Sequence, residues 1–235
     1  MKRNTILWLL RSTLAVCCIA AVVLCYTSFD ASAAQSDIRA LIADFDDEIV
    51  SSSDSMLNLS SNPYDYIVHN KNYTSLVSHG FAALPDIEAA LADQKDNGLS
   101  TYILAIAYEE ITNMDLKADS YMGRFFWDSG KKFYSRLEPY KSYLPEAVEN
   151  IAEGDGTVAL KAFRFRKLGA LAAPYMMDIW EKASPETREA IEIAIPYVMQ
   201  NNSIEKETQT VTATEMGDWS EYAEDIQIIR EYLDD

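Results

Sequence analysis

Apolar residues recur at intervals of three and four along most of the chain after residue 35, and alternation of apolar and polar residues is almost absent. The first spacing places side chains on one face of an α-helix, whereas alternation would indicate a half-buried β-strand. Glycine, which weakens helices, is scarce, with 8 residues among 235. We therefore predict an all-α protein of about nine helices.

The apolar stripes set the expected helix boundaries. We expect helices at 36–50, 63–69, 73–94, 99–111, 157–180, 186–200 and 218–233. Residues 116–153 predict two short helices that are interrupted near Ser129 and Pro139, because a proline within a helix removes a hydrogen bond. Residues 201–214 are polar, and their "TQTVTAT" alternates weakly, which is compatible with a strand. We interpret this segment as a linker.

One short pattern occurs twice. "GFAALP", which begins at Gly80 and ends at Pro85, is followed 89 positions later by "GALAAP", which runs from Gly169 to Pro174. In both copies the apolar stripe continues through the glycine and the proline. Because proline bends a helix axis and glycine lets another backbone come close, we predict one continuous, bent helix in each copy. A return helix follows each, so that each copy forms an antiparallel pair.

Two units of the chain resemble HEAT-type helical repeats: "LVSHGFAALPDIEAALADQKDNGLSTYILAIAYEE" and "FRFRKLGALAAPYMMDIWEKASPETREAIEIAIPYVM". In that family, the first helix of each pair commonly carries a glycine, small residues and a proline. The units cover about 70 of 235 residues and are not adjacent, and Asp96 and Arg188 correspond only approximately to the family's usual Asp and Arg. The resemblance implies helix pairs stacked as a short array, which serves as a binding scaffold without a particular activity.

The N-terminus has the layout of a secretory signal. Three basic residues, Lys2, Arg3 and Arg11, precede an uncharged run from Ser12 to Phe29. Small residues follow at Ala31 and Ala33. We expect cleavage after Ala33. An uncleaved anchor remains the alternative, because this run of 18 residues is long enough to span a membrane. Both interpretations place the remainder outside the cytoplasm, either secreted or held at the outer face of the cytoplasmic membrane.

The expected domain plan follows from these boundaries. Residues 1–33 are the signal or anchor, and residues 34–202 form the HEAT-like domain, with units at about 73–111 and 157–200. Residues 203–235 hold a polar linker and an amphipathic C-terminal helix.

Composition limits the chemistry of the exported part. All three cysteines lie within the first 25 residues, which excludes disulfides, thiolate nucleophiles and cysteine-bound zinc from the folded domain. From Ala34 onward, 17 basic residues face 36 acidic ones, a net charge of −19. Such a surface repels nucleic acid and anionic lipid, so we expect no nucleic-acid binding and membrane contact only through the N-terminal segment.

Few residues suggest catalysis. His69 and His79 are the only histidines, and neither lies in a metal-binding motif, so we expect no metal site and no cofactor. Ser129 and Lys132 match the S-x-x-K pattern of penicillin-recognising enzymes, but the partner motifs of that class are missing. We therefore assign no catalytic residue. The alternative is a cell-envelope glycan-cleaving enzyme that uses a helix-borne glutamate, Glu109 or Glu110, as its acid.

An aromatic-rich segment is the candidate for partner binding, because exposed aromatic residues often anchor interfaces. The alternative is that the rings fill the core between the two units. The candidates are Tyr121, Phe125, Phe126, Trp127, Phe133 and Tyr134. The sequence thus predicts a non-enzymatic module that binds or regulates a protein or peptide, and it leaves the oligomeric state open.

Overall fold

The computed structural model describes residues 37–45, 47–49, 60–68, 70–93, 98–117, 123–200 and 220–234. All regular structure in these ranges is helical, which confirms the all-α class. The predicted signal or anchor, the linker at 201–214, His69 and Tyr121 lie outside the described residues. The chain divides into two compact parts, Met1–Ala40 and Leu41–Asp235, and all the labelled helices below belong to the second part.

Residues 37–45 and 47–49 are helical, in agreement with the first predicted helix. The later helices are α2 (Tyr64–Ile67), α3 (Lys71–Ser78), α4 (Leu84–Asp93), α5 (Leu99–Thr112), α6 (Gly130–Glu153), α7 (Val158–Arg166), α8 (Ala173–Trp180), α9 (Pro185–Met199) and α10 (Ala223–Asp234). Short 3₁₀ helices lie at Gly80–Ala83, Gly123–Phe125, Ala170–Ala172 and Ser220–Tyr222.

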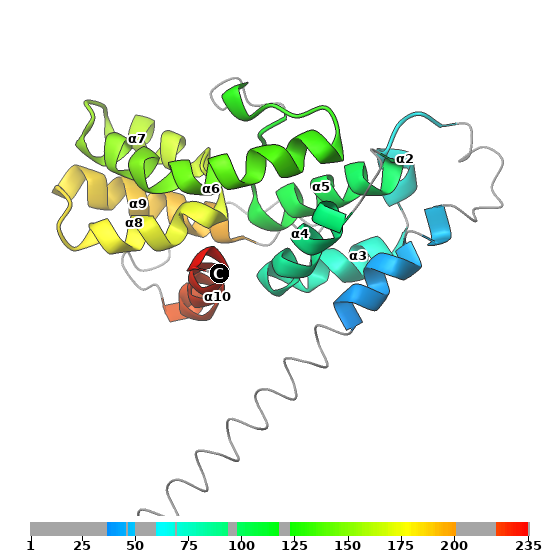
Figure 1. The fold of residues 1–235 in the computed structure, drawn as a ribbon. Helices are drawn as coiled ribbons and strands as arrows, with labels where there is room; N and C mark the ends of the chain where they lie inside the picture. The colour runs from blue at the N-terminus through cyan, green and yellow to red at the C-terminus, as the bar shows by residue number, and fades with distance from the viewer. Residues whose placement is uncertain are drawn as a thin grey trace, which may run out of the picture. The chain divides into compact units, whose positions relative to one another are not determined.

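The two predicted units have the same order of elements (Figure 1). The first consists of α3, the turn Gly80–Ala83, α4 and α5, and the second of α7, the turn Ala170–Ala172, α8 and α9. Each element of the second unit lies close to 89 residues after its counterpart. In both units, the last two helices pack against each other.

The predicted continuous bent helix is wrong in both units, because the glycine ends the first helix. Gly80 has φ = 58° and Gly169 has φ = 65°, a left-handed conformation that L-residues with a side chain adopt only with strain. Pro85 and Pro174 each occupy the second position of the following helix, α4 or α8. There a proline costs no hydrogen bond, because the amides of the first turn have no partner within the helix.

The predicted interruption near Ser129 is confirmed, because Ser129 is the N-cap of α6. The predicted interruption at Pro139 is wrong, since α6 continues for 24 residues through Pro139 and Pro145. Both prolines are exposed, so the carbonyl that each leaves without a helical donor can turn toward water. The opposite face supplies the stabilisation through a buried stripe at helical spacing. The stripe consists of Phe133, Leu137, Tyr140, Leu144, Ala147, Val148 and Ile151.

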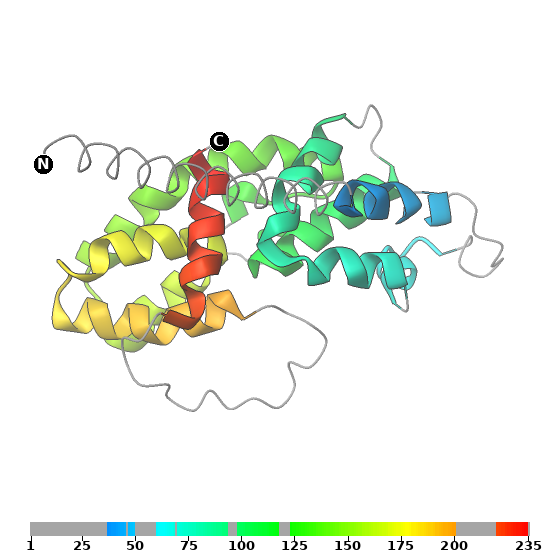
Figure 2. The ribbon, with the colours of Figure 1, turned by 90° about the horizontal axis from the view of Figure 1, so that it is seen from below.

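α6 and α10 connect the two units. α6 packs against α4 and α5 of the first unit and against α7 and α8 of the second. α10 packs against α8 and against both 3₁₀ turns, and it lies across the side of the helices seen in Figure 2. At the 89-residue offset, α10 corresponds to residues 134–145 of α6. α10 packs against α8 as α6 packs against α4. We therefore call α6 the third helix of the first unit and α10 the third helix of the second. Within the described residues, no helix is both long and apolar enough to cross a membrane.

Candidate functional site

A cavity of about 490 Å³ lies where α4, α6, α8 and α10 meet. Two of these helices belong to the predicted units, one to each, and the other two are the third helices that join the units. The lining combines charged, hydroxyl and apolar groups: Pro85, Glu88, Glu138, Lys141, Ser142, Pro145, Tyr175, Tyr232 and Leu233.

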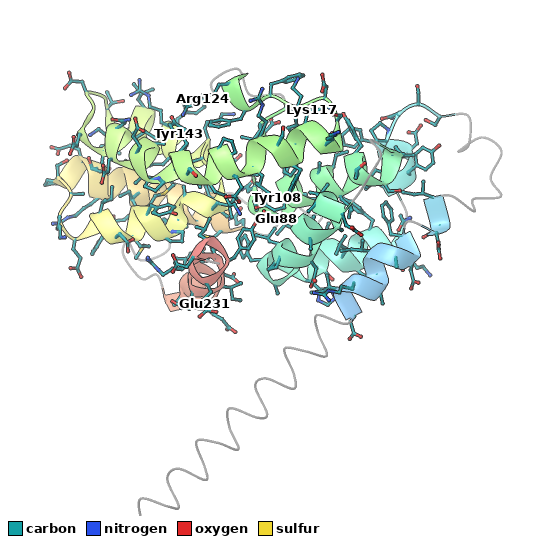
Figure 3. The ribbon with its side chains drawn as sticks, in the orientation of Figure 1. Glu88, Tyr108, Lys117, Arg124, Tyr143 and Glu231 are labelled. Carbon is teal, nitrogen blue, oxygen red and sulfur yellow. The ribbon has the colours of Figure 1, made fainter. Side chains whose placement is uncertain are left out.

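Four polar side chains of the cavity, those of Glu88, Glu138, Lys141 and Tyr232, form one connected network. The Nζ of Lys141 lies 3.2 Å from Oε2 of Glu88 and also pairs with Glu138. The hydroxyl of Tyr232 donates to Glu88 and lies 2.7 Å from the hydroxyl of Tyr108, a fully buried residue. Figure 3 shows Glu88 and Tyr108 close together beside α10. α4, α6 and α10 are thus joined through side chains that line the cavity, and Tyr108 extends the network into α5.

The network changes from buried to exposed along its length. The side chains of Lys141 and Glu88 are 15% and 18% exposed, whereas that of Glu138 is 65% exposed. Glu138 therefore lies at the mouth of the cavity, and Glu88 lies inside. The Nζ of Lys141 is also 4.8 Å from the ring centre of Tyr232, where a cation is attracted by the face of the ring.

Two tyrosines supply neutral hydroxyls. Burial, together with the neighbouring Tyr108 and the hydrogen bond to Glu88, raises the pKa of Tyr232 far above its ordinary value. Burial and the charge of Asp234 raise the pKa of Tyr175. Both phenols therefore remain protonated near neutral pH. Tyr232 already donates its single proton to Glu88, so of the two only the hydroxyl of Tyr175 can donate to a ligand.

The predicted aromatic surface is largely core. Phe125, Trp127 and Phe133 are 5%, 0% and 0% exposed, and the ring centres of Trp127 and Phe133 are 5.3 Å apart. These three rings therefore cannot contact a partner in this structure, because neighbouring side chains already cover them. Phe126 and Tyr134 are 41% and 36% exposed and stay available.

The two glutamates of the enzymatic alternative hold the chain together locally. Oε1 of Glu109 accepts hydrogen bonds from the indole of Trp127 and the amide of Leu116, both at 2.8 Å. Burial raises the pKa of Glu109 to about 7. Glu110 accepts from the hydroxyl of Tyr73 at 2.5 Å. Neither glutamate lines the cavity.

The S-x-x-K match has a structural explanation. Ser129 is the N-cap of α6, and its hydroxyl accepts from the amide of Lys132 at 3.3 Å. The ammonium of Lys132 pairs with Asp128 at 3.4 Å rather than with Ser129. Among the described residues, no group of three or more His, Asp or Glu side chains is arranged to hold a metal ion.

Sequence reasoning missed the residues of the cavity, because they come from four helices and form no local motif. The repeat offset offered one signal. Extended into the third helices, it aligns Lys141 with Arg230 and Tyr143 with Tyr232. Arg230 pairs with Asp178 on α8 at 2.7 Å, as Lys141 pairs with Glu88 on α4. In each unit, a basic residue of the third helix thus pairs with an acidic residue of the helix that follows the glycine turn, α4 or α8.

No family model matches the chain, and no curated protein or solved structure gives a significant match. The resemblance to HEAT-type repeats therefore stays a prediction, and function has to be argued from the geometry alone.

Proposed function

We propose that the chain is a non-enzymatic binding module that acts outside the cytoplasm and recognises a protein or peptide partner. The observation that carries the proposal is the cavity between the two units, with its network of Glu88, Lys141 and Tyr232. A volume of about 490 Å³ lies within the range of ligand pockets, and it accommodates a side chain with its flanking backbone. We further propose that the stacked helix pairs follow a HEAT-like plan; the shared order of elements at one offset supports this.

The charges of the cavity favour a basic segment of the partner. Two carboxylates, Glu88 and Glu138, line it, against the single ammonium of Lys141. The carboxylate of Asp234 acts on the neighbouring Tyr175. A lysine or arginine side chain would meet the exposed carboxylate of Glu138 at the mouth and the tyrosine hydroxyls inside. Its methylene groups would contact the apolar rim formed by Pro85, Pro145 and Leu233.

A calorimetric titration tests this proposal with a defined probe, the peptide acetyl-Ala-Lys-Ala-amide, and the same peptide acetylated on the lysine Nζ. We expect the first to bind and the second not to bind, because acetylation removes the charge. Glu138→Gln should weaken binding about fivefold, as expected for the loss of a partly exposed ion pair.

Glu149→Gln is the matched control, since Glu149 is an exposed glutamate of the same helix that does not line the cavity. The proposal fails if neither peptide binds at millimolar concentration, or if both variants weaken binding equally.

The alternative is a cell-envelope enzyme that cleaves glycans with Glu109 or Glu110 as the acid. Its one favourable observation is the pKa of Glu109, raised to about 7, which suits a general acid. Against it, an oxygen of Glu109 is engaged by two donors of the chain itself. The double variant Glu109→Gln, Glu110→Gln decides the question in an assay of cell-wall glycan turnover. Cleavage by the unmodified protein that disappears in the double variant would replace the binding proposal.

A further inference from the structure

Exposed apolar side chains gather on two packed helices. Eight large apolar side chains are exposed among the described residues, and four of these lie on α7 and α9. They are Leu160 (40% exposed), Phe163 (52%), Ile193 (38%) and Tyr197 (40%). α7 and α9 pack directly against each other. We call these four residues, together with Arg166 and Lys167, the α7–α9 patch.

Two basic side chains contact the exposed apolar residues of the patch. The guanidinium of Arg166 lies 4.8 Å from the ring centre of Tyr197, and it donates to the carbonyl of Ile193 at 3.3 Å. The Nζ of Lys167 lies 5.5 Å from the ring centre of Phe163. Arg166 of α7 and Lys167, the residue that follows the end of α7, thus lie against exposed apolar residues of both helices.

The charge of the chain distinguishes this surface from the rest. The chain carries a net charge of −17, so that two copies repel each other over most orientations. Residues 156–177, which include α7, contain no Asp or Glu and four basic residues. The α7 side of the patch therefore adds no acidic charge to the repulsion between copies, and Leu160 and Phe163 are exposed there.

The patch also carries the charges that a second copy would need. Glu189 lies four residues before Ile193 on α9 and is exposed, so it shares the stripe of Ile193 and Tyr197. A two-fold contact brings the same surface of both copies together. In such a contact, Glu189 of one copy can face Arg166 or Lys167 of the other. An anionic membrane offers no partner for Glu189 and would be repelled by it.

We infer that the α7–α9 patch is a self-association surface through which two copies of the chain form a symmetric dimer. The apolar side chains supply the buried centre of the contact, and the acidic and basic residues supply its polar rim. This inference concerns a different surface from the cavity, and it does not depend on the ligand proposed above.

A photo-crosslinking experiment on the full chain tests the inference. A photoreactive phenylalanine analogue replaces Phe163, and in a matched control it replaces Tyr134, an exposed aromatic residue of α6 outside the patch. We expect a homodimer crosslink from position 163 and none from position 134. No homodimer from position 163, or crosslinks from it only to lipid or to another protein, would overturn the inference.

Two sets of variants sharpen the result in sedimentation velocity experiments. Phe163→Asp should raise the dimer dissociation constant at least tenfold, whereas Tyr134→Asp should leave it unchanged. Lys167→Glu and Glu189→Lys should each weaken the dimer, and the two together should restore it. If Glu189→Lys alone strengthens association with anionic vesicles and the double variant restores nothing, the surface binds a membrane and the inference is wrong.

Discussion

Glu109 is a buried carboxyl group whose ionisation opposes folding. Its pKa rises from an ordinary 4.5 to about 7, because burial outweighs the hydrogen bonds from Trp127 and Leu116. For a group whose pKa is raised on folding, the contribution to stability is complete below the unfolded pKa. It is lost as the pH rises through the folded pKa. Stability should therefore fall between about pH 4.5 and pH 7 through this residue.

Glu109→Gln tests this dependence, since the amide oxygen can still accept both hydrogen bonds but carries no charge. We expect the variant to have a free energy of unfolding about 2 kcal/mol above that of the unmodified protein at pH 8, and nearly the same value at pH 4. Chemical denaturation at the two pH values measures the difference. An equal difference at both would show that ionisation of Glu109 is not its cause.

Gly169 makes a sharp turn that a side chain would obstruct. A Cβ atom there would lie 2.7 Å from the carbonyl oxygen of Thr112 and 2.8 Å from Cγ of Met114, in addition to the strain of φ = 65°. We expect Gly169→Ala to lower the free energy of unfolding by at least about 2 kcal/mol. Gly123→Ala is the control, because its Cβ would have open space, and thermal unfolding measures both. A similar melting temperature for the two variants would contradict this explanation.

The same glycine shows what the sequence can and cannot specify. The 89-residue offset predicted correctly that Gly80 and Gly169 are equivalent, because both repeat the same local pattern. It did not predict the sign of φ at either position. Gly169 combines its positive φ with a close approach to Thr112 and Met114. These residues lie more than 50 positions earlier in the chain, so a local pattern does not reveal the contact. A helix-bending proline and a proline at the start of a new helix also look alike until the glycine conformation is known.

At the scale of elements, α6 shows how burial overrides local preference. Pro139 removes the amide that would bond to the carbonyl of Ser135, an effect that costs about 3 kcal/mol in a helix interior, although proline also restricts the unfolded chain by about 1 kcal/mol. We expect Pro139→Ala to raise the free energy of unfolding by about 1–2 kcal/mol. Glu149→Ala, also on the exposed side of α6, should change little. A lower melting temperature for Pro139→Ala would mean that the proline fits a distortion that the helix needs.

The sequence predicted the helices better than it predicted how they meet. The amphipathic C-terminal helix that helical spacing predicts is present as α10, and its Ile226 and Ile229 are buried. The position of α10 across both units, which brings Tyr232 to Tyr108 and Glu88, depends on tertiary packing that no periodicity encodes. The aromatic segment illustrates the same limit. Phe126 and Trp127 are adjacent aromatic residues, but Trp127 is fully buried and Phe126 is exposed.

At the scale of the whole molecule, repulsion among the acidic residues is larger than attraction within the exposed ion pairs. The chain carries 37 acidic and 20 basic residues. Among the described residues, the pairs Lys132–Asp128 and Arg230–Asp178 are substantially exposed, and such pairs contribute at most about 1 kcal/mol each. Salt weakens both repulsion and pairing between exposed charges, since the Debye length falls from about 30 Å at 0.01 M to about 8 Å at 0.15 M. With 17 more acidic than basic residues, the repulsion is the larger of the two effects.

We therefore expect the melting temperature to rise as NaCl increases from about 10 to 150 mM, by a few degrees for a change of about 1 kcal/mol. The measurement belongs on the Phe163→Asp variant as well as on the unmodified chain, because dimerisation would add its own dependence on salt and concentration. Sucrose at equal osmolality is the control, since it carries no charge and leaves the Debye length unchanged. A melting temperature that falls with NaCl in both proteins would contradict this expectation. It would mean that the ion pairs, including the partly buried pair of Lys141 and Glu88, stabilise the fold by more than the repulsion among acidic residues destabilises it.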